Sequence, residues 1–395
     1  MLGNTLAYKA VAELMVILQT IRLLNDRSSA QAQAQAQGIS MELTDQSTKI
    51  RTGEELDAGL IDPYLKAHIP ELRGVPVISQ FPGGASNLTY LIQYPDKELV
   101  LRRPPFGHKA RSAHDMGREY RILNQLKDAF PFCPEAYVHC TDESLIGSEF
   151  YVMQRLKGII LRSDLPPQLG LDARQTESLC KSFIDKLVNL HQVDYRACGL
   201  GDLGKPQGYV QRQILGWSER YEKAMTPDAP AWEQVKRWLV DKMPADSPTS
   251  SIVHNDYRFD NVILDPADPM SIIGVLDWEL TTLGDPLMDL GNTLAYWIQA
   301  DDPAPVQAVR RQPSNAPGML SRQGFVDYYA ERSGMRIDNV DFYYTYGLFR
   351  LAGIVQQIYY RFFHGQTQDK RFARFIDMNR LLEQMSLNVI AKSSL

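Results

Sequence analysis

The chain has 395 residues, of which 44% are hydrophobic and 23% charged, and its formal net charge is −5. This length allows two medium-sized lobes, each with its own core. The negative charge and scattered arginines exclude the basic footprint of a nucleic-acid-binding protein, and no run reaches the ~20 apolar residues of a membrane-spanning helix. Four cysteines without metal-site spacing predict reduced, mostly buried thiols in a cytoplasmic protein: Cys133, Cys140, Cys180 and Cys198.

Residues 1–40 differ from the rest of the chain. Residues 6–24 fit an amphipathic helix, and the Ala-Gln repeat that follows is typical of a low-complexity linker. We expect the globular part to begin near Met41. The heptapeptide LGNTLAY at 2–8 recurs at 290–296, and the sequence gives no physical reason for this duplication.

The first globular segment predicts a short helix followed by an antiparallel sheet. Gly83, Gly84, Ser86 and Asn87 lie in the connection between the first two strands. Because glycine lets backbone N–H groups approach phosphate oxygens, this connection is either a phosphate-binding loop or an ordinary hairpin turn. The predicted helix spans 54–67, and the predicted strands span 75–81, 86–94 and 98–103.

The third strand carries a cation near its end, Arg102. Arginine stays charged and can bind phosphate through two donors. The helix predicted over 112–127 has an apolar stripe at helical spacing and carries Glu119 on another face. Glu119 is therefore either the carboxylate that pairs with Arg102 or a solvated surface residue.

The middle of the chain is predicted to be mainly helical after one more strand. That strand covers 150–153 and ends at Met153. A helix over 172–191 has one apolar face, which makes His191 a core or helix-end histidine. Residues 199–250 are expected to form helices interrupted by prolines.

Residues 251–261 are the most informative stretch. Short apolar runs flank a polar loop that presents Asp256 and, five residues later, Asn261; a further strand over 272–276 leads to Asp277. Metal-assisted phosphoryl transfer needs a carboxylate to orient or accept a hydroxyl proton, and oxygen ligands for Mg²⁺. An isolated Asp or Asn after a strand is more often a turn residue, but the three together favour a catalytic loop.

The remainder is predicted to be helical and to bear on the substrate. Between positions 335 and 375 there are six basic residues and three acidic ones, which favours a neutral or anionic acceptor over a polycation unless these arginines are solvated. A helix is expected over 286–297 with Asp285 as its N-cap, then a loop over 301–317 and helices over 339–363 and 369–391.

The order of these motifs resembles that of the aminoglycoside phosphotransferase and choline kinase-like family, which are small-molecule kinases. The resemblance rests on His254-x-Asp256-x-x-x-x-Asn261, on Asp277, and on the sequence GDPxxDL that begins at Gly284. The amino-acid sequence of the loop, together with LRRPP at 101–105, is similar to the sequences of one branch of this family, the kinase-like domains fused to acyl-CoA dehydrogenases. The resemblance to the family covers about residues 75–365.

The resemblance implies an α+β, protein-kinase-like two-lobed fold, with a β-sheet N-lobe over 41–155 and a mainly helical C-lobe over 156–395. It implies ATP and Mg²⁺ as cofactors and a small-molecule hydroxyl as acceptor, with a hydroxyacyl-CoA fitting the charge, and no nucleic-acid or membrane partner. The implied roles are catalysis by Asp256, metal binding by Asn261 and Asp277, and nucleotide binding by Arg102, Glu119, Gly83, Gly84, Ser86, Asn87 and Met153.

Two alternatives stay open. An aminoglycoside O-phosphotransferase would use the same machinery with a different pocket. A catalytically silent nucleotide-binding protein would explain why Arg102 stands where kinases have Lys, and why Asn255 stands where the family has Gly.

Overall fold

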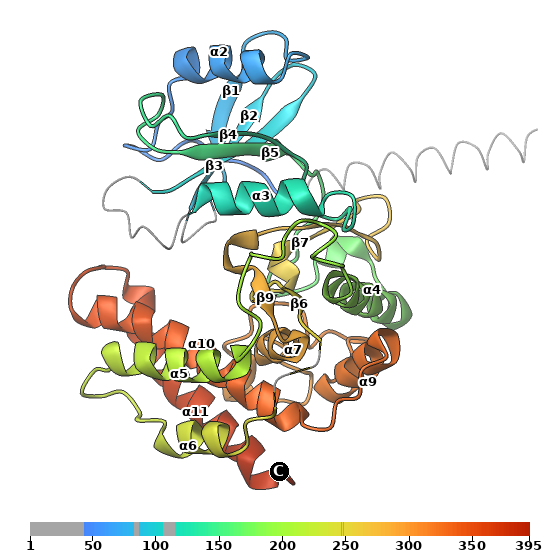
Figure 1. Ribbon diagram of the computed structural model, residues 1–395, viewed down its shortest axis with the longest axis vertical. Coiled ribbons are helices and arrows are strands. Elements are labelled where there is room, and N and C mark those ends of the chain that lie inside the picture. Colours follow the sequence, from blue (N-terminus) through green and yellow to red (C-terminus); the bar gives the residue numbers. More distant parts are fainter. Residues whose placement is uncertain (1–42, 83–86, 106–114, 246, 248) are drawn as a thin grey trace, which may run out of the picture.

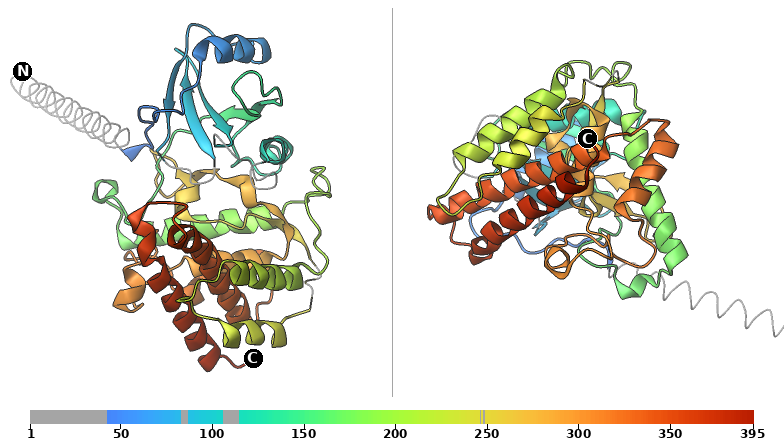
Figure 2. Two further views of the ribbon diagram at one scale, coloured as in Figure 1. Left: turned by 90° about the vertical axis from the view of Figure 1, so that its left-hand side faces the viewer. Right: turned by 90° about the horizontal axis from the view of Figure 1, so that it is seen from below.

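The computed structural model of the chain has two lobes, a β-sheet lobe and a larger, mainly helical lobe (Figures 1 and 2). The predicted helix at 6–24 and the first heptapeptide copy lie outside the described residues. Within the part of the chain that is described, none of the helices combines the length and apolar character needed to cross a bilayer. The structure describes residues 43–82, 87–105, 115–245, 247 and 249–395.

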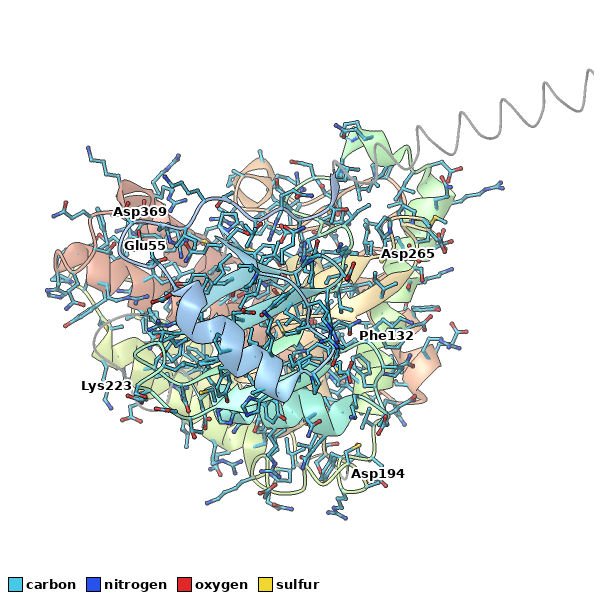
Figure 3. All side chains as sticks on the ribbon, turned by 90° about the horizontal axis from the view of Figure 1, so that it is seen from above. Glu55, Phe132, Asp194, Lys223, Asp265 and Asp369 are labelled. Carbon is cyan, nitrogen blue, oxygen red and sulfur yellow. The ribbon has the colours of Figure 1, made fainter. Side chains whose placement is uncertain are left out.

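The N-terminal lobe is built on one antiparallel sheet with strand order β1-β2-β3-β5-β4. Helix α2 covers its outer face, as the view from above shows (Figure 3), and α3 packs against the opposite face. The predicted helices and strands of this lobe are confirmed, and β4 is an addition. Its elements are α2 (Ala58–His68), β1 (Val77–Gln80), β2 (Leu88–Gln93), β3 (Glu98–Arg103), α3 (Met116–Leu126), β4 (Ala136–Cys140) and β5 (Phe150–Gln154).

The two-residue period of β3 determines where Arg102 lies. Leu99 and Leu101 point into the core shared with α2, whereas Val100 joins the core beneath α3. Because successive side chains of a strand alternate between faces, Arg102 lies on the side of Val100. Arg103 lies on the opposite side, where its Nη1 donates to the Ile146 carbonyl at 2.8 Å.

The C-terminal lobe packs its helices around the buried α7 and α10. Two short two-stranded ribbons, β6-β9 and β7-β8, lie between these helices and the sheet lobe (Figure 1). The elements are α4 (Ala173–His191), α5 (Tyr209–Lys223), α6 (Glu233–Asp241), β6 (Ser251–Val253), β7 (Val262–Leu264), β8 (Ile272–Val275), β9 (Thr282–Gly284), α7 (Pro286–Ala295), α8 (Ala304–Gln307), α9 (Arg322–Ser333), α10 (Val340–Phe363) and α11 (Phe375–Lys392).

Several predicted elements of this lobe need correction. The expected loop over 301–317 contains the short helix α8, which has proline in its first turn, where the missing N–H costs nothing. The last helix begins with a 3₁₀ turn, Lys370–Arg374, before α11. Helix α9 was not predicted, although Ser321 caps its start and Gly334 ends it in a left-handed conformation.

Helices α7 and α10 approach each other so closely that their backbones touch at two glycines. A Cβ on Gly291 would lie 2.1 Å from the Tyr343 carbonyl oxygen, and one on Gly347 would lie 2.1 Å from the Gly291 carbonyl oxygen. Only glycine permits this contact, because backbone atoms cannot move aside as a flexible side chain can. The contact fixes α10 against the helix that follows the catalytic segment.

We expect Gly347→Ala to lower the free energy of unfolding by about 1–3 kcal/mol, because the added methyl overpacks the α7–α10 contact. Urea unfolding followed by circular dichroism measures this loss. Gly324→Ala is the matched control, since Gly324 lies inside α9 and a Cβ there meets only ordinary contacts at 3.5 Å or more. Equal stability of the two variants would show that the helices can separate without cost.

Candidate active site

The loop after β6 is held by a single buried carboxylate, that of Asp289 on α7. Asp289 accepts the backbone N–H of His254 and that of Asn255, each at 2.7 Å. His191 approaches the same carboxylate, with Nε2 3.1 Å from Oδ2. Burial alone would raise the pKa of Asp289, but the hydrogen bond and charge of His191 and the backbone hydrogen bond from His254 lower it below its ordinary value.

His254 supports the loop from within. Its Nε2 donates to the Leu276 carbonyl at 2.9 Å, which leaves Nδ1 to accept the backbone N–H of Asp256 at 3.3 Å. Asn255 adopts the left-handed conformation with φ 65°. Asparagine is one of the few residues that enter this region readily, so it serves here where glycine would otherwise be expected.

The predicted catalytic and metal-binding residues lie together. The Asn261 amide nitrogen donates to Oδ2 of Asp256 at 2.9 Å and to the Asp256 carbonyl at 2.8 Å, which turns its own carbonyl oxygen away from Asp256. The backbone N–H of Leu276 donates to the Asn261 carbonyl at 2.8 Å, so the chain delivers Asp277 beside Asn261. Asp277 has φ 68° and begins a short 3₁₀ turn.

Arg102 reaches from β3 across to these residues. Its Nη2 lies 3.2 Å from Asp277 Oδ1, and its Nε lies 3.5 Å from Glu119 Oε2 on α3. Tyr151, the cross-strand neighbour of Arg102 on β5, donates to the same Glu119 oxygen at 2.5 Å. Burial raises the pKa of Glu119, and the Arg102 charge and the Tyr151 hydrogen bond oppose this rise. The predicted Arg102–Glu119 contact is therefore present.

Part of the predicted phosphate-binding loop falls outside the description. Gly83, Gly84 and Ser86 lie outside the described residues. Asn87 is buried, and its amide nitrogen donates to Glu279 Oε2 at 2.9 Å. Asn87 thus joins the sheet lobe to the turn that follows Asp277.

A cleft of about 180 Å³ separates the lobes above the catalytic loop. Met153, which was predicted to contact nucleotide, lies in its wall, so the wall combines an apolar part with a polar end. The apolar part comprises Phe81, Val100, Met153, Leu156, Ile263 and Leu276, and the polar end includes Arg102, Arg155, Arg162, Asp260, Asn261 and Asp277. A flat apolar group and an anionic group fit such a cleft together.

Sequence reasoning missed two residues of the loop, Arg258 and Asp260. The Arg258 guanidinium lies between two carboxylates, with Nε 3.1 Å from Asp256 Oδ1 and Nη1 3.2 Å from Asp260 Oδ2. Its carbon also lies 4.8 Å from the centre of the Tyr296 ring. The sequence pattern Asp-x-Arg-x-Asp could have predicted this arrangement, because it places one cation between two acidic residues.

Glu279 is a third residue that the sequence did not indicate. Carboxylate oxygens of Glu119, Asp277 and Glu279 lie within 4.8 Å of one another. Arg102 compensates them, with its Nη2 3.8 Å from Glu279. A cation that binds Asp277 would therefore enter a strongly anionic group of carboxylates, in which the positive charge of Arg102 is already present.

This fold and site define a phosphotransferase of the small-molecule kinase type. Residues 77–325 match the phosphotransferase enzyme family, and the chain belongs to that family. The predicted family resemblance and the α+β, protein-kinase-like fold are thereby confirmed. Choline kinase from Cryptosporidium parvum shares this fold, with a TM-score of 0.58 at 11% identity over 85% of this chain and 96% of that one.

More similar proteins are of two kinds. The solved structure of a Ralstonia eutropha protein assigned as an aminoglycoside phosphotransferase has a TM-score of 0.74 and 30% identity, covering 86% of this chain and 100% of that one. Acyl-CoA dehydrogenase family member 11 of Gallus gallus is 31% identical over 359 residues, which are 88% of this chain and 45% of that protein. Member 10 of Mus musculus is 35% identical over 310 residues, 78% of this chain and 28% of that protein. The chain spans less than half of these two relatives.

We expect Asp289→Asn to lower the free energy of unfolding at pH 7 by about 1–3 kcal/mol, because an amide cannot accept all three hydrogen bonds. Since the folded-state pKa of Asp289 is depressed, its contribution is complete above the unfolded pKa of about 3.9 and is lost as pH falls through the folded pKa. The difference between wild type and variant should therefore shrink in acid. Urea unfolding between pH 7 and pH 3 measures it.

The exposed Asp327 on α9 provides the control. Asp327→Asn should leave the unfolding free energy unchanged across the same pH range, because Asp327 is exposed and its carboxylate accepts a hydrogen bond from the surface residue Gln323. A constant difference between Asp289→Asn and wild type at every pH would contradict the assigned role of the Asp289 charge.

Proposed function

We propose that the chain transfers the γ-phosphate of ATP, in the presence of Mg²⁺, to a hydroxyl group of a small molecule. The observation that carries this proposal is the meeting of Asp256, Asn261 and Asp277 below the cleft with Arg102 opposite them. Phosphoryl transfer depends on positioning and charge neutralisation more than on covalent chemistry by the protein. This set of side chains supplies both.

Each residue then has a definite part. Asp256 orients the acceptor hydroxyl and takes its proton. The side-chain carbonyl oxygen of Asn261 and the carboxylate of Asp277 are hard oxygen donors, which suit Mg²⁺. The bound ion would neutralise phosphate charge. Asn261 also holds Asp256 in place through its amide nitrogen.

Nucleotide binding requires an exchange of partners at Arg102. In the structure Arg102 is paired with Asp277 and Glu119. Phosphate oxygens would take the place of Asp277 beside the guanidinium, which frees that carboxylate for Mg²⁺. Glu119 keeps Arg102 directed into the cleft throughout, and the apolar wall around Met153 accommodates the base.

The acceptor that we propose is a hydroxyacyl-CoA. Two relatives that match most of this chain are named for acyl-CoA dehydrogenation, which supports an acyl-CoA-derived hydroxyl. Not all of the basic residues between 335 and 375 support an anionic acceptor. Arg336 and Arg371 pair with neighbouring aspartates at the surface, so their charges are already balanced. Arg350 differs, because it is buried.

We expect Asp256→Asn to lower acceptor-dependent ADP release at least 100-fold while leaving ATP binding within twofold, because the amide cannot take the hydroxyl proton. Release of ADP from ATP and Mg²⁺ is measured across hydroxyacyl-CoAs, aminoglycosides, choline and amino alcohols, and ATP binding by calorimetry. Asp128→Asn, at an exposed position after α3, is the control and should be fully active.

The same measurements separate the remaining candidates. ADP release that depends on an aminoglycoside and not on a hydroxyacyl-CoA would replace the proposed acceptor. ATP binding without turnover on any acceptor would indicate a catalytically silent protein. Normal turnover by Asp256→Asn would exclude Asp256 as the base.

A further inference from the structure

Arg350, near the middle of α10, is a buried cation without a counter-ion among the described residues. The residue is only 4% exposed. Among the residues that the structure describes, no carboxylate forms an ion pair with it and no acceptor takes a hydrogen bond from its guanidinium. The guanidinium packs against an aromatic face, since its carbon lies 5.4 Å from the centre of the Trp217 ring on α5.

The surroundings of Arg350 connect it to the catalytic loop. Arg350 lies one helical turn after Tyr346 on α10, so the two side chains share a face of that helix. Burial raises the pKa of Tyr346 to about 12 and also raises the pKa of Tyr209 and Tyr296, and in all three the Arg350 charge opposes the rise. Tyr209 donates a hydrogen bond to Oδ1 of Asn255, the residue before Asp256, at 3.2 Å. Tyr296 packs against Arg258, the ion-pair partner of Asp256.

A charge buried without a partner is costly, and proteins avoid it unless a ligand provides the counter-charge. In the described part of the chain, the guanidinium nitrogens of Arg350 are not among the fully enclosed polar atoms that lack a partner, so a small area of the guanidinium remains in contact with solvent. The carboxylates nearest to the loop are already committed, because Asp256 and Asp260 both pair with Arg258. Arg350 therefore needs an oxygen-bearing group from outside the protein.

We propose that Arg350 binds the acyl oxygen of the acceptor substrate and so selects hydroxyacyl compounds. This inference rests on the proposed phosphotransferase function and deepens it by naming the group that the acceptor must carry. Arginine donors suit either a free carboxylate or a thioester carbonyl, and both are acyl oxygens close to the hydroxyl of a short hydroxyacyl group. A polycationic acceptor is disfavoured, because it would place like charges together in a buried site.

The test measures binding separately from turnover. Calorimetry with wild type uses three probes with one carbon skeleton: 3-hydroxyoctanoate, 3-hydroxyoctanoyl-CoA and 1,3-octanediol. We expect Arg350→Met to weaken binding of the acyl probe by about 10- to 100-fold and to leave diol and ATP binding unchanged, since a hydrogen bond from a charged donor is lost. Arg350→Lys should restore part of the affinity, and Arg336→Met, at a side chain that is 87% exposed, should match wild type.

The three probes also identify which acyl oxygen is bound. If Arg350→Met loses affinity for 3-hydroxyoctanoate alone, Arg350 binds a free carboxylate. If the variant also loses affinity for 3-hydroxyoctanoyl-CoA, Arg350 binds the thioester carbonyl. The inference is overturned if wild type binds no acyl probe more tightly than the diol, or if Arg350→Met binds them as wild type does.

A purely structural role for Arg350 predicts a different result. If the contact with Trp217 were its purpose, Arg350→Met would melt at a lower temperature and keep the affinities of wild type. An acyl-binding role predicts an equal or higher melting temperature, because a buried unpaired charge is removed. If the acyl probe binds through Arg350 but no ADP is released, the phosphotransferase function fails while the assignment of Arg350 stands.

Discussion

The buried Asp289 carboxylate is the interaction on which the catalytic loop depends. Two consecutive backbone N–H groups, those of His254 and Asn255, converge on it, and this requires the left-handed conformation of Asn255. Asp256 follows directly, so its backbone is positioned by a helix in the core, whereas Asn261 and Arg258 of the loop hold its carboxylate. Because α7 is buried along its whole length, the loop inherits the rigidity of the core.

At the site, charged and polar side chains join the two lobes beside the apolar wall of the cleft. Arg102 of the sheet lobe faces Asp277 and Glu279 of the helical lobe, and Asn87 contacts the same Glu279. These contacts are strong only while water is largely excluded, so opening of the cleft would weaken them together. The relative position of the lobes and the charge state of the site are therefore linked.

The sequence allowed a sound prediction wherever a local pattern determines the structure. Arg102 was predicted near the end of the third strand, and loop spacing placed Asp256, Asn261 and Asp277, because each pattern acts over a few residues. It failed where partners are distant in sequence. Nothing local to Glu279 indicates its contact with Asn87, 192 positions away. Strand β6 likewise pairs with β9 and not with β7, the next strand of the chain. Arg350 was counted as one cation among six because burial is a property of the folded lobe.

The glycine contact between α7 and α10 has a consequence for how this scaffold can change. Gly291 and Gly347 fix the distance between the helix that anchors the catalytic loop and the helix that carries Arg350. Side chains of α10 that do not touch α7 can therefore be exchanged without altering that distance. Such a scaffold holds the reaction geometry constant while the residues that contact the acceptor differ.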